Sequence, residues 1–335
     1  MKGPGRFFLA GIAAAAALGL LAFAKAGTGD PAPKAVGSSS GLNFVDDPLS
    51  GTLTVRDGAE GVLAYHYGEN LPEGIDPAYS RSCYIHPLYS LGGEVLTDDF
   101  PADHLHHHGL FWAWPVVKTR GVATGNWQPG RPSLSHHFVR WREREVRDGA
   151  VRLRAENAWR LYGGEVVAEE TVQILVHPAD GDGRAIDMEL RIIPVGGPLE
   201  LRGSPEDNKG YGGLCFRGNP SFRGAALTTD LGPLEEDSTD RRFRWADVST
   251  PDKGVAIFVS ENHPGFPTTW LVRNSYAGIL NPSWPGLEGA VLTPGKPATL
   301  RYCVYVHRGD AGQGGAARAY ERYAARSGPA RETDR

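Results

Sequence analysis

The alternation of apolar and polar residues between positions 138 and 194 is the feature that most constrains the fold. From Val151 to Trp159, apolar side chains alternate with arginine and glutamate. Successive side chains of a β-strand point to opposite faces, so this period of two indicates a strand with one buried face. Asp148-Gly149 and Gly163-Gly164 flank the run, and such dipeptides favour the tight turns of antiparallel hairpins. The pattern predicts a four-stranded antiparallel meander.

Shorter strand-like runs fill most of the remaining chain. They are Leu53–Arg56, Val62–Tyr67, Tyr84–Ser90, Leu110–Val117, Gly213–Arg217, Arg242–Val248, Val255–Ser260, Trp270–Asn274 and Leu300–His307. Only the segment Ala311–Arg326 places its apolar residues at helical spacing. Many strands, short turns and little helix are typical of sandwiches and barrels. We therefore predict an all-β fold, a large antiparallel two-sheet sandwich with one C-terminal helix.

The first 26 residues have the pattern of a secretory signal peptide. Lys2 and Arg6 precede the apolar stretch Phe7–Ala24, and Ala24-Lys25-Ala26 matches a small-x-small cleavage site. The apolar stretch is also close to the length of a spanning helix, so an uncleaved anchor is the alternative. We expect an exported protein, periplasmic or extracellular, that contacts a membrane only through such an anchor.

Composition divides the rest of the chain into three parts. Residues 27–41 are rich in Gly, Pro and Ser, which favours a flexible linker, and 327–335 form a polar tail expected to be disordered. Residues 42–326 show no internal change in composition, so we expect a single β-sandwich domain. The net charge of −4 and the lack of a basic run argue against nucleic acid as a partner. The three cysteines are widely spaced and odd in number, which indicates buried thiols and not a disulfide framework.

A histidine cluster is the first candidate site. Four of the eleven histidines lie between positions 104 and 108, directly after Asp103. Histidine is readily tuned to transfer protons near neutral pH and is also a common metal ligand. One hypothesis makes His106 or His107 the catalytic proton-transfer group, with Asp103 orienting it and His108 contacting substrate.

A metal site is the second hypothesis for the cluster, and a purely structural role is the third. If the segment is extended, His104, His106 and His108 share one face, and His104 with His106 could bind a divalent metal. Asp103 or a distant histidine would be the third ligand, and His136-His137 is a second pair that could contribute. The chain has no His-Glu-x-x-His motif and no acidic residue at cupin-type spacing, so we name no cofactor beyond a possible divalent metal.

Glu170 is the only charged residue on the apolar face of the alternating run 166–176. If this face is the core, the carboxyl group is desolvated and needs a partner or has a raised pKa. A raised pKa suits a general acid, so Glu170 is a candidate catalytic partner. A bulge that turns Glu170 to the sheet edge is the alternative.

Two loops add candidates for contact with the substrate. Lys209 and Tyr211 supply hydrogen-bond donors in the glycine-rich segment 208–213, and the strand that follows ends at Arg217. Pro264 and Pro267 stiffen the loop that carries His263, a further catalytic candidate. A simple turn is the alternative for each loop.

Aromatic residues and one more histidine complete the candidate set. His86 belongs to a polar group just upstream of the cluster, and Trp112 and Trp270 are candidate stacking platforms for sugar rings. Most of the eight tryptophans are explained equally well as core or rim packing.

These motifs together resemble a known bacterial family. The segments Tyr84–Tyr89, Asp99–Leu110, Lys209–Gly213, His263-Pro264 and Trp270–Arg273 resemble the family called methane oxygenase PmoA-like, a domain of unknown function of the DUF6807 type. His108 stands where that family usually has arginine. The chain has no internal hydrophobic span, so the resemblance does not imply the membrane-bound oxygenase. It implies an exported β-sandwich similar to galactose-mutarotase-like supersandwiches, which are common among carbohydrate-degrading systems.

Three functional hypotheses follow. The leading one is an exported carbohydrate-active enzyme that hydrolyses, eliminates or epimerises a sugar or glycoside at a histidine-rich acid/base site. The second is a metal-dependent enzyme that uses the His104–His106 pair. The third is a non-catalytic glycan-binding protein in which the histidines belong to the scaffold. In each, the partner is a small-molecule or glycan substrate.

Overall fold

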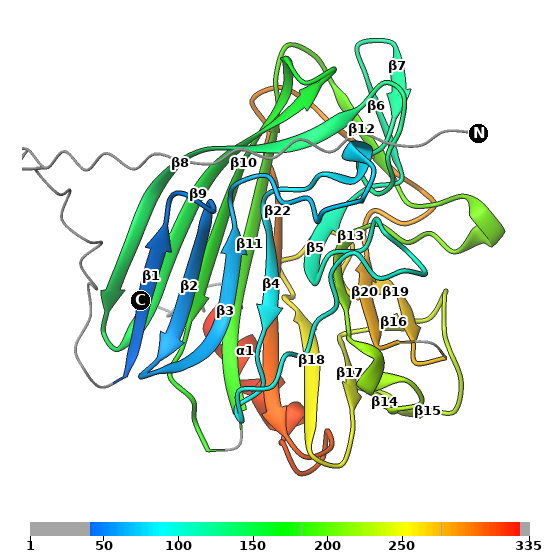
Figure 1. Cartoon of the computed structure of the whole chain (residues 1–335). Helices are drawn as coiled ribbons and strands as arrows, with labels where there is room; N and C mark the ends of the chain where they lie inside the picture. Colours follow the sequence, from blue (N-terminus) through cyan, green and yellow to red (C-terminus); the bar gives the residue numbers. More distant parts are fainter. Residues whose placement is uncertain (1–40, 182, 276, 329–335) are drawn as a thin grey trace, which may run out of the picture. The chain divides into compact units, whose positions relative to one another are not determined.

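A computed structural model describes residues 41–181, 183–275 and 277–328. The predicted signal peptide, nearly all of the predicted linker and most of the predicted tail lie outside these residues. Within them, the chain forms two nine-stranded sheets and one four-stranded sheet, all with antiparallel pairing (Figure 1). The predicted all-β, two-sheet antiparallel class is confirmed, and the four-stranded sheet is an addition to it.

The first sheet joins the N-terminal strands to a group from the second half of the chain. In spatial order it contains β1 (Leu42–Asp47), β2 (Thr52–Asp57), β3 (Glu60–His66), β4 (Tyr84–Leu88), β5 (Leu110–Ala113), β13 (Gly213–Arg217), β20 (Ile279–Ser283), β19 (Thr268–Arg273) and β16 (Arg242–Phe243).

The second sheet contains the predicted meander. In spatial order it contains β15 (Gly232–Leu234), β14 (Ala226–Thr229), β17 (Trp245–Ser249), β18 (Lys253–Val259), β22 (Ala298–Arg308), β11 (Gly183–Pro194), β10 (Glu165–Val176), β9 (Ala150–Leu161) and β8 (Leu134–Arg147). The four strands β8 to β11 pair in sequence order, which confirms the meander.

The small sheet consists of β21 (Ala290–Leu292), β12 (Leu199–Arg202), β6 (Val116–Thr119) and β7 (Val122–Thr124). The run predicted as one strand from Leu110 to Val117 is therefore divided between β5 and β6, which belong to different sheets. Pro115 lies at the division, where a missing N–H interrupts a strand ladder. Short 3-10 turns cover Pro77–Tyr79, Glu206–Asn208 and Pro220–Phe222.

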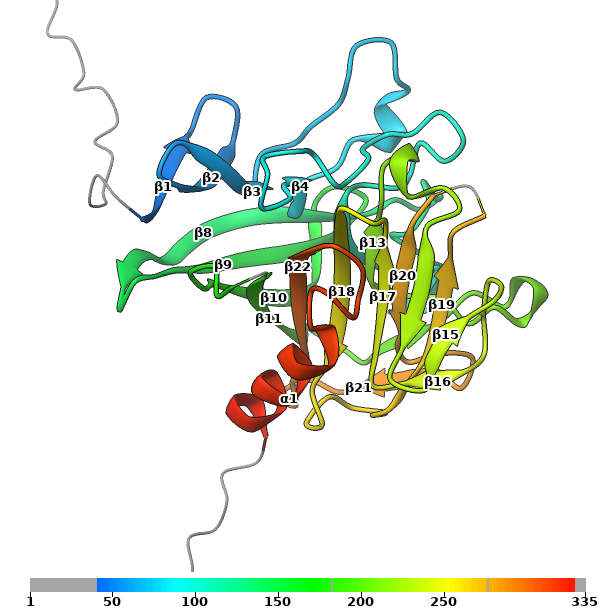
Figure 2. The ribbon, with the colours of Figure 1, turned by 90° about the horizontal axis from the view of Figure 1, so that it is seen from below.

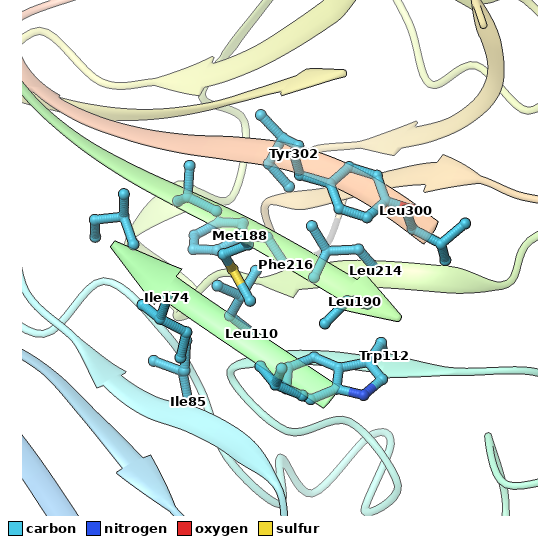
Figure 3. Packing of buried hydrophobic residues seen from close by; sticks show 14 of the residues in the cluster. Ile85, Leu110, Trp112, Ile174, Met188, Leu190, Leu214, Phe216, Leu300 and Tyr302 are labelled. Atoms are coloured by element: carbon cyan, nitrogen blue, oxygen red, sulfur yellow. The ribbon is translucent and has the colours of Figure 1, made fainter. Parts of the chain in front are cut away.

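The core lies where the two large sheets face each other. Figure 3 shows Trp112 and Leu110 of β5 with Leu214 and Phe216 of β13, packed toward side chains of β10, β11 and β22. Along β11 every second residue from Ile186 to Ile192 is apolar and buried, as alternation requires when one face of a sheet is covered.

The helix α1 (Ala316–Ser327) packs on β18 and β22 of the second sheet, as Figure 2 shows. The prediction began it five residues earlier, at Ala311. Gly315 has a left-handed φ of 65°, and the residues before it form turns, so the helix begins only afterwards. In the described part of the chain, no helix is long and apolar enough to cross a membrane. All three cysteines are buried free thiols, as predicted.

Candidate active site

The histidine cluster forms a compact turn between β4 and β5, which corrects the extended geometry assumed above. The His104 N–H donates to the Pro101 carbonyl at 2.9 Å, and the His107 N–H donates to the His104 carbonyl at 2.8 Å. The His104 and His107 rings therefore stack, 4.8 Å apart and nearly parallel. The expected alternation, with His107 facing away from the other three rings, is wrong because the backbone turns within the segment.

Gly109 returns the chain from this turn into β5. Its φ is 48°, and a Cβ atom at this position would clash with the Ile85 carbonyl oxygen on β4. Only glycine combines a left-handed backbone with such a close approach. The position of the histidines relative to β4 therefore depends on Gly109.

Asp99 and His108 form a buried acid–imidazole pair that the sequence did not reveal. His108 Nδ1 lies 2.9 Å from Asp99 Oδ1, and His108 is 2% exposed. The Tyr84 hydroxyl donates to the other Asp99 oxygen at 2.8 Å, and the Asn70 amide donates to that hydroxyl at 2.7 Å. Because the carboxylate accepts a hydrogen bond from Nδ1–H, the neutral ring keeps Nε2 as its proton acceptor.

Burial sets the charge of the histidines. It lowers the pKa of His106 to about 4, with the neighbouring histidines and Arg217 adding to the effect. It also lowers the pKa values of His107 and His108 well below the usual range for histidine. Burial raises the pKa of Asp99, partly offset by His86, the Tyr84 hydroxyl and His66. At neutral pH these three imidazoles are therefore neutral and can accept protons.

A cleft of about 470 Å³, here called the histidine cleft, is lined by His106 and His108 together with side chains from β8 and the loop before it. His136 and His137 on β8 and Trp127 in that loop line it as well. The predicted second histidine pair and the cluster thus share one cleft. The volume falls within the range of roughly 300–1,000 Å³ found for ligand pockets.

The cleft wall beneath His136 is held by a buried amide. The Trp114 N–H donates to Asn126 Oδ1 at 2.7 Å, which fixes the orientation of this amide. Asn126 Nδ2 then donates to His136 Nε2 at 2.7 Å, so a neutral His136 carries its proton on Nδ1. The His136 ring stacks on Trp159 at 4.9 Å, which fixes the ring plane.

A second hollow of about 200 Å³, here called the lysine pocket, adjoins the histidine cleft. His106 and Trp127 line both, and His104, His107, Lys209 and Tyr211 line the lysine pocket alone. The Tyr211 ring lies 4.9 Å from Trp127. The glycine-rich loop and the histidine cluster, which are about a hundred residues apart in sequence, thus line one pocket.

Asp103 does not orient His106 or His107, contrary to the expectation. Both of its oxygens accept from Arg217 Nη2, at 2.8 and 3.0 Å, and one of them lies 3.2 Å from His104 Nδ1. Arg217 is 3% exposed, and its other terminal nitrogen lies 3.5 Å from His107 Nδ1. Arg217 therefore supports the cluster from behind and does not line either hollow.

Glu170 and Trp112 belong to the core, not to the site. Glu170 is 1% exposed, so the predicted burial on the apolar face holds. Its oxygens accept from Trp112 Nε1 and Trp159 Nε1 at 2.9 Å and from Asn157 Nδ2 at 2.8 Å. Neither Glu170 nor Trp112 lines the histidine cleft or the lysine pocket. The Trp112 indole and the Glu170 carboxylate are thus hydrogen-bond partners inside the sandwich.

His263, Trp270 and His86 also lie away from the two hollows. His263 is 3% exposed, and its Nε2 lies 2.8 Å from the Tyr302 hydroxyl. Trp270 is fully buried and donates to the Phe243 carbonyl at 2.8 Å. His86 Nδ1 lies 2.9 Å from the Thr97 hydroxyl. Each candidate is engaged by its own neighbours, so none is placed to contact a molecule in the cleft.

The metal hypothesis gains no support from this arrangement. Within residues 41–328, leaving out 182 and 276, no three His, Cys, Asp or Glu side chains are grouped so that they could hold one metal ion. The His104 and His106 rings lie 5.6 Å apart, edge to face.

Comparisons with known proteins give a family but no activity. No curated protein matches the sequence. Among solved structures, heparinase III with methylated lysines aligns with 83% of this chain at 9% identity and a TM-score of 0.34. The chain spans 36% of that protein's length, and at this TM-score the likeness supports no inference. A family model matches residues 52–321, and its description contains no methane oxygenase activity. The chain belongs to this family of unknown function, DUF6807.

Proposed function

We propose that the protein is an enzyme that acts on a sugar or glycoside by proton transfer through His108 and Asp99. The observation that carries the proposal is the buried Asp99–His108 pair at the wall of the histidine cleft. His108 replaces His106 and His107 as the preferred proton-transfer group, because His108 is the one of these three histidines that contacts a carboxylate.

The pair can act as a general base. His108 Nε2 takes a proton from a substrate hydroxyl, or from a carbon next to a carbonyl group, while the O–H or C–H bond breaks. The imidazolium that forms is stabilised by Asp99, which keeps its negative charge and its hydrogen bond to Nδ1. The same nitrogen can return the proton to a leaving oxygen on that side of the sugar, whereas epimerisation needs a second proton donor on the opposite face of the carbon. Elimination and epimerisation begin with this proton abstraction, and in hydrolysis the same nitrogen would take its proton from the attacking water.

The lining of the histidine cleft suits a sugar. Trp127 contributes an aromatic part of the lining, and Gln128 and His137 supply polar groups for hydroxyls. Sugar rings combine an apolar C–H face with a rim of hydroxyls, so a mixed wall of this kind fits them.

We also propose that the enzyme is exported and meets its substrate outside the cytoplasm. The basic start, apolar stretch and small-x-small site of residues 1–26 support this proposal. Fractionation of cells that express the full chain, with N-terminal sequencing of the product, tests it. A product with an intact N-terminus in the cytoplasm would contradict it.

Matched acid–imidazole variants test the catalytic proposal. We would measure turnover of a panel of aryl glycosides, uronides and keto-sugars for the wild type, His108→Gln and Asp99→Asn. His177→Gln is the control, because His177 Nε2 forms the same kind of contact with Asp187, at 2.8 Å, on the second sheet. We expect kcat to fall about 10²- to 10⁴-fold in the first two variants and to stay unchanged in the control. Equal turnover in His108→Gln, or saturable sugar binding without any product, would contradict catalysis by this pair.

A further inference from the structure

The lysine pocket contains two cations that the proposed proton transfer does not use. Lys209 and Arg273 both line it, and Glu206 is the only carboxylate among the described residues that do so. Trp127, Leu271 and Ile279 form an apolar wall beside these charges. Low-dielectric walls strengthen the attraction between fixed cations and an incoming anion.

The present partners of these cations are weak competitors. Lys209 Nζ lies 3.3 Å from Glu206 Oε1 and 3.0 Å from Asp207 Oδ2, but those side chains are 63% and 75% exposed. Arg273 Nε lies 4.0 Å from Asp237 Oδ2, at the outer limit of an ion pair. The carboxylates that pair with Lys209 are screened by solvent, and the Arg273–Asp237 contact is long, so both cations are held weakly and can bind an incoming anion.

Other charges near the pocket lie behind the histidines and largely cancel. Arg217 is paired with Asp103, which also contacts His104. The three histidines that line the pocket bring no negative charge. Among the side chains that line the pocket, Lys209 and Arg273 carry two positive charges and Glu206 carries one negative charge. Asp207 and Asp237, the other partners of the two cations, do not line it.

We infer that the lysine pocket is a subsite for an oxyanion group, a carboxylate or sulfate, on the substrate. This inference rests on the proposed function and specifies its substrate class as an acidic sugar. Because His106 and Trp127 line both hollows, an acidic group in the lysine pocket belongs to a molecule whose other part reaches the histidine cleft. The pocket thereby selects among sugars, while Asp99 and His108 perform the proton transfer.

Calorimetric titration with three probes tests the subsite. The probes are methyl glucuronide, a sulfated glucose and methyl glucoside, which carry a carboxylate, a sulfate and no charge. We expect one of the two acidic probes to bind at least about tenfold more tightly than methyl glucoside at low salt, with the preference shrinking as salt is added. The stronger acidic probe identifies which oxyanion the pocket takes.

Charge-removing variants locate the effect. Arg273→Gln and Lys209→Gln should each weaken binding of the acidic probe about five- to tenfold and leave methyl glucoside unchanged. Arg301→Gln is the control, because Arg301 pairs with Glu189 on the second sheet and does not line the pocket. Equal binding of acidic and neutral probes, no binding of any probe, or a preference that survives in the Arg273/Lys209 double variant would overturn the subsite.

The outcomes separate the subsite from the proposed function. Turnover of neutral sugars alone, with no acidic preference, would overturn the subsite and leave the proposed enzyme in place. An acidic preference that depends on Arg273, without turnover of any sugar, would support the subsite and overturn the proposed function.

Discussion

Replacement of Glu170 tests whether this buried carboxylate is structural, as its contacts indicate. The side chain accepts three hydrogen bonds, from the indoles of Trp112 and Trp159 and from the Asn157 amide. A leucine would fill similar space but would leave the two buried indole N–H groups without an acceptor, while Asn157 Nδ2 would keep only the Tyr65 hydroxyl, at 3.2 Å. Each unpaired donor costs about 1–3 kcal/mol, so we expect Glu170→Leu to lower the free energy of unfolding by at least about 2 kcal/mol.

Glu170→Gln is the matched variant. One glutamine oxygen can keep both indole contacts, because Trp112 and Trp159 share Glu170 Oε2. The new amide nitrogen then faces Asn157, whose Oδ1 has no hydrogen-bond partner among the described residues. Rotation of the Asn157 amide can therefore supply an acceptor, and we expect a loss of about 1 kcal/mol or less.

The difference in stability between Glu170→Gln and the wild type should depend on pH in a definite direction. Burial raises the pKa of Glu170 above its unfolded value, although three hydrogen bonds oppose the shift. The folded state thus holds this proton more tightly, and the resulting stability is present below the unfolded pKa and is lost as pH rises through the folded pKa. Glutamine does not titrate, so the stability of Glu170→Gln relative to wild type should increase between acidic and neutral pH.

Urea unfolding followed by far-UV circular dichroism at pH 5 and pH 7.5 measures these differences. Turnover of Glu170→Gln should stay near the wild-type value, since Glu170 lines neither hollow. If Glu170→Leu were as stable as wild type, the reasoning about unpaired donors would be refuted. A stable Glu170→Gln variant without activity would instead make Glu170 a catalytic residue.

Three further predictions follow from the histidines and the turn that holds them. Removal of the nearby guanidinium in Arg217→Met should raise the pKa of His106 above its value of about 4, which NMR titration of the ring can measure; an unchanged pKa would rule out the charge effect. Burial lowers the pKa of His263 to about 3, so the free energy of unfolding of the wild type should fall as pH drops from about 6.5 toward 3. His263→Gln should show a shallower fall in the same urea titration, and parallel curves for the two proteins would contradict this. Gly109→Ala should destabilise the fold by roughly 2 kcal/mol or more, because its methyl group would clash with the Ile85 carbonyl in a left-handed backbone. Thermal unfolding measures this, with Gly58→Ala as the control, since Gly58 also has a positive φ but an added methyl group there would contact no other atom.

Local patterns predicted the parts of the fold that local geometry determines. The meander from β8 to β11 was predicted because its side chains alternate and turn residues bound its strands. Gly213–Arg217 was predicted as one of the shorter strand-like runs. The burial of Glu170 followed from the same alternation. Its partners did not, because Trp112 lies 58 positions away on the opposite sheet. A strand pattern predicts which face of the sheet a side chain is on, but it does not predict which residue of the opposite sheet contacts it.

The candidate site shows the same limit. His106, His136, Lys209 and Tyr211 were each singled out by local composition, and the fold brings them around two adjoining hollows. The geometry of the histidine segment was not predictable from an assumed strand, because Gly109 and the backbone turns place the rings. Asp99 escaped notice because its role depends on the chain reversing between positions 99 and 108, which brings the carboxylate back beside the ring.

Asp99 and Glu170 show why a raised pKa alone does not identify a catalytic acid. Burial raises the pKa of both carboxyl groups, and both accept several hydrogen bonds. The partners of Glu170 are indole and amide groups, which do not exchange protons near neutral pH, and Glu170 lines neither hollow. One partner of Asp99 is His108, whose ring can carry a second proton and lines the histidine cleft. Asp99 is connected to the cleft through a group that can transfer a proton, whereas Glu170 is not. Asp99→Asn should therefore lower kcat while changing the free energy of unfolding little. Glu170→Leu should lower the free energy of unfolding, and any loss of kcat should be no larger than this loss of stability.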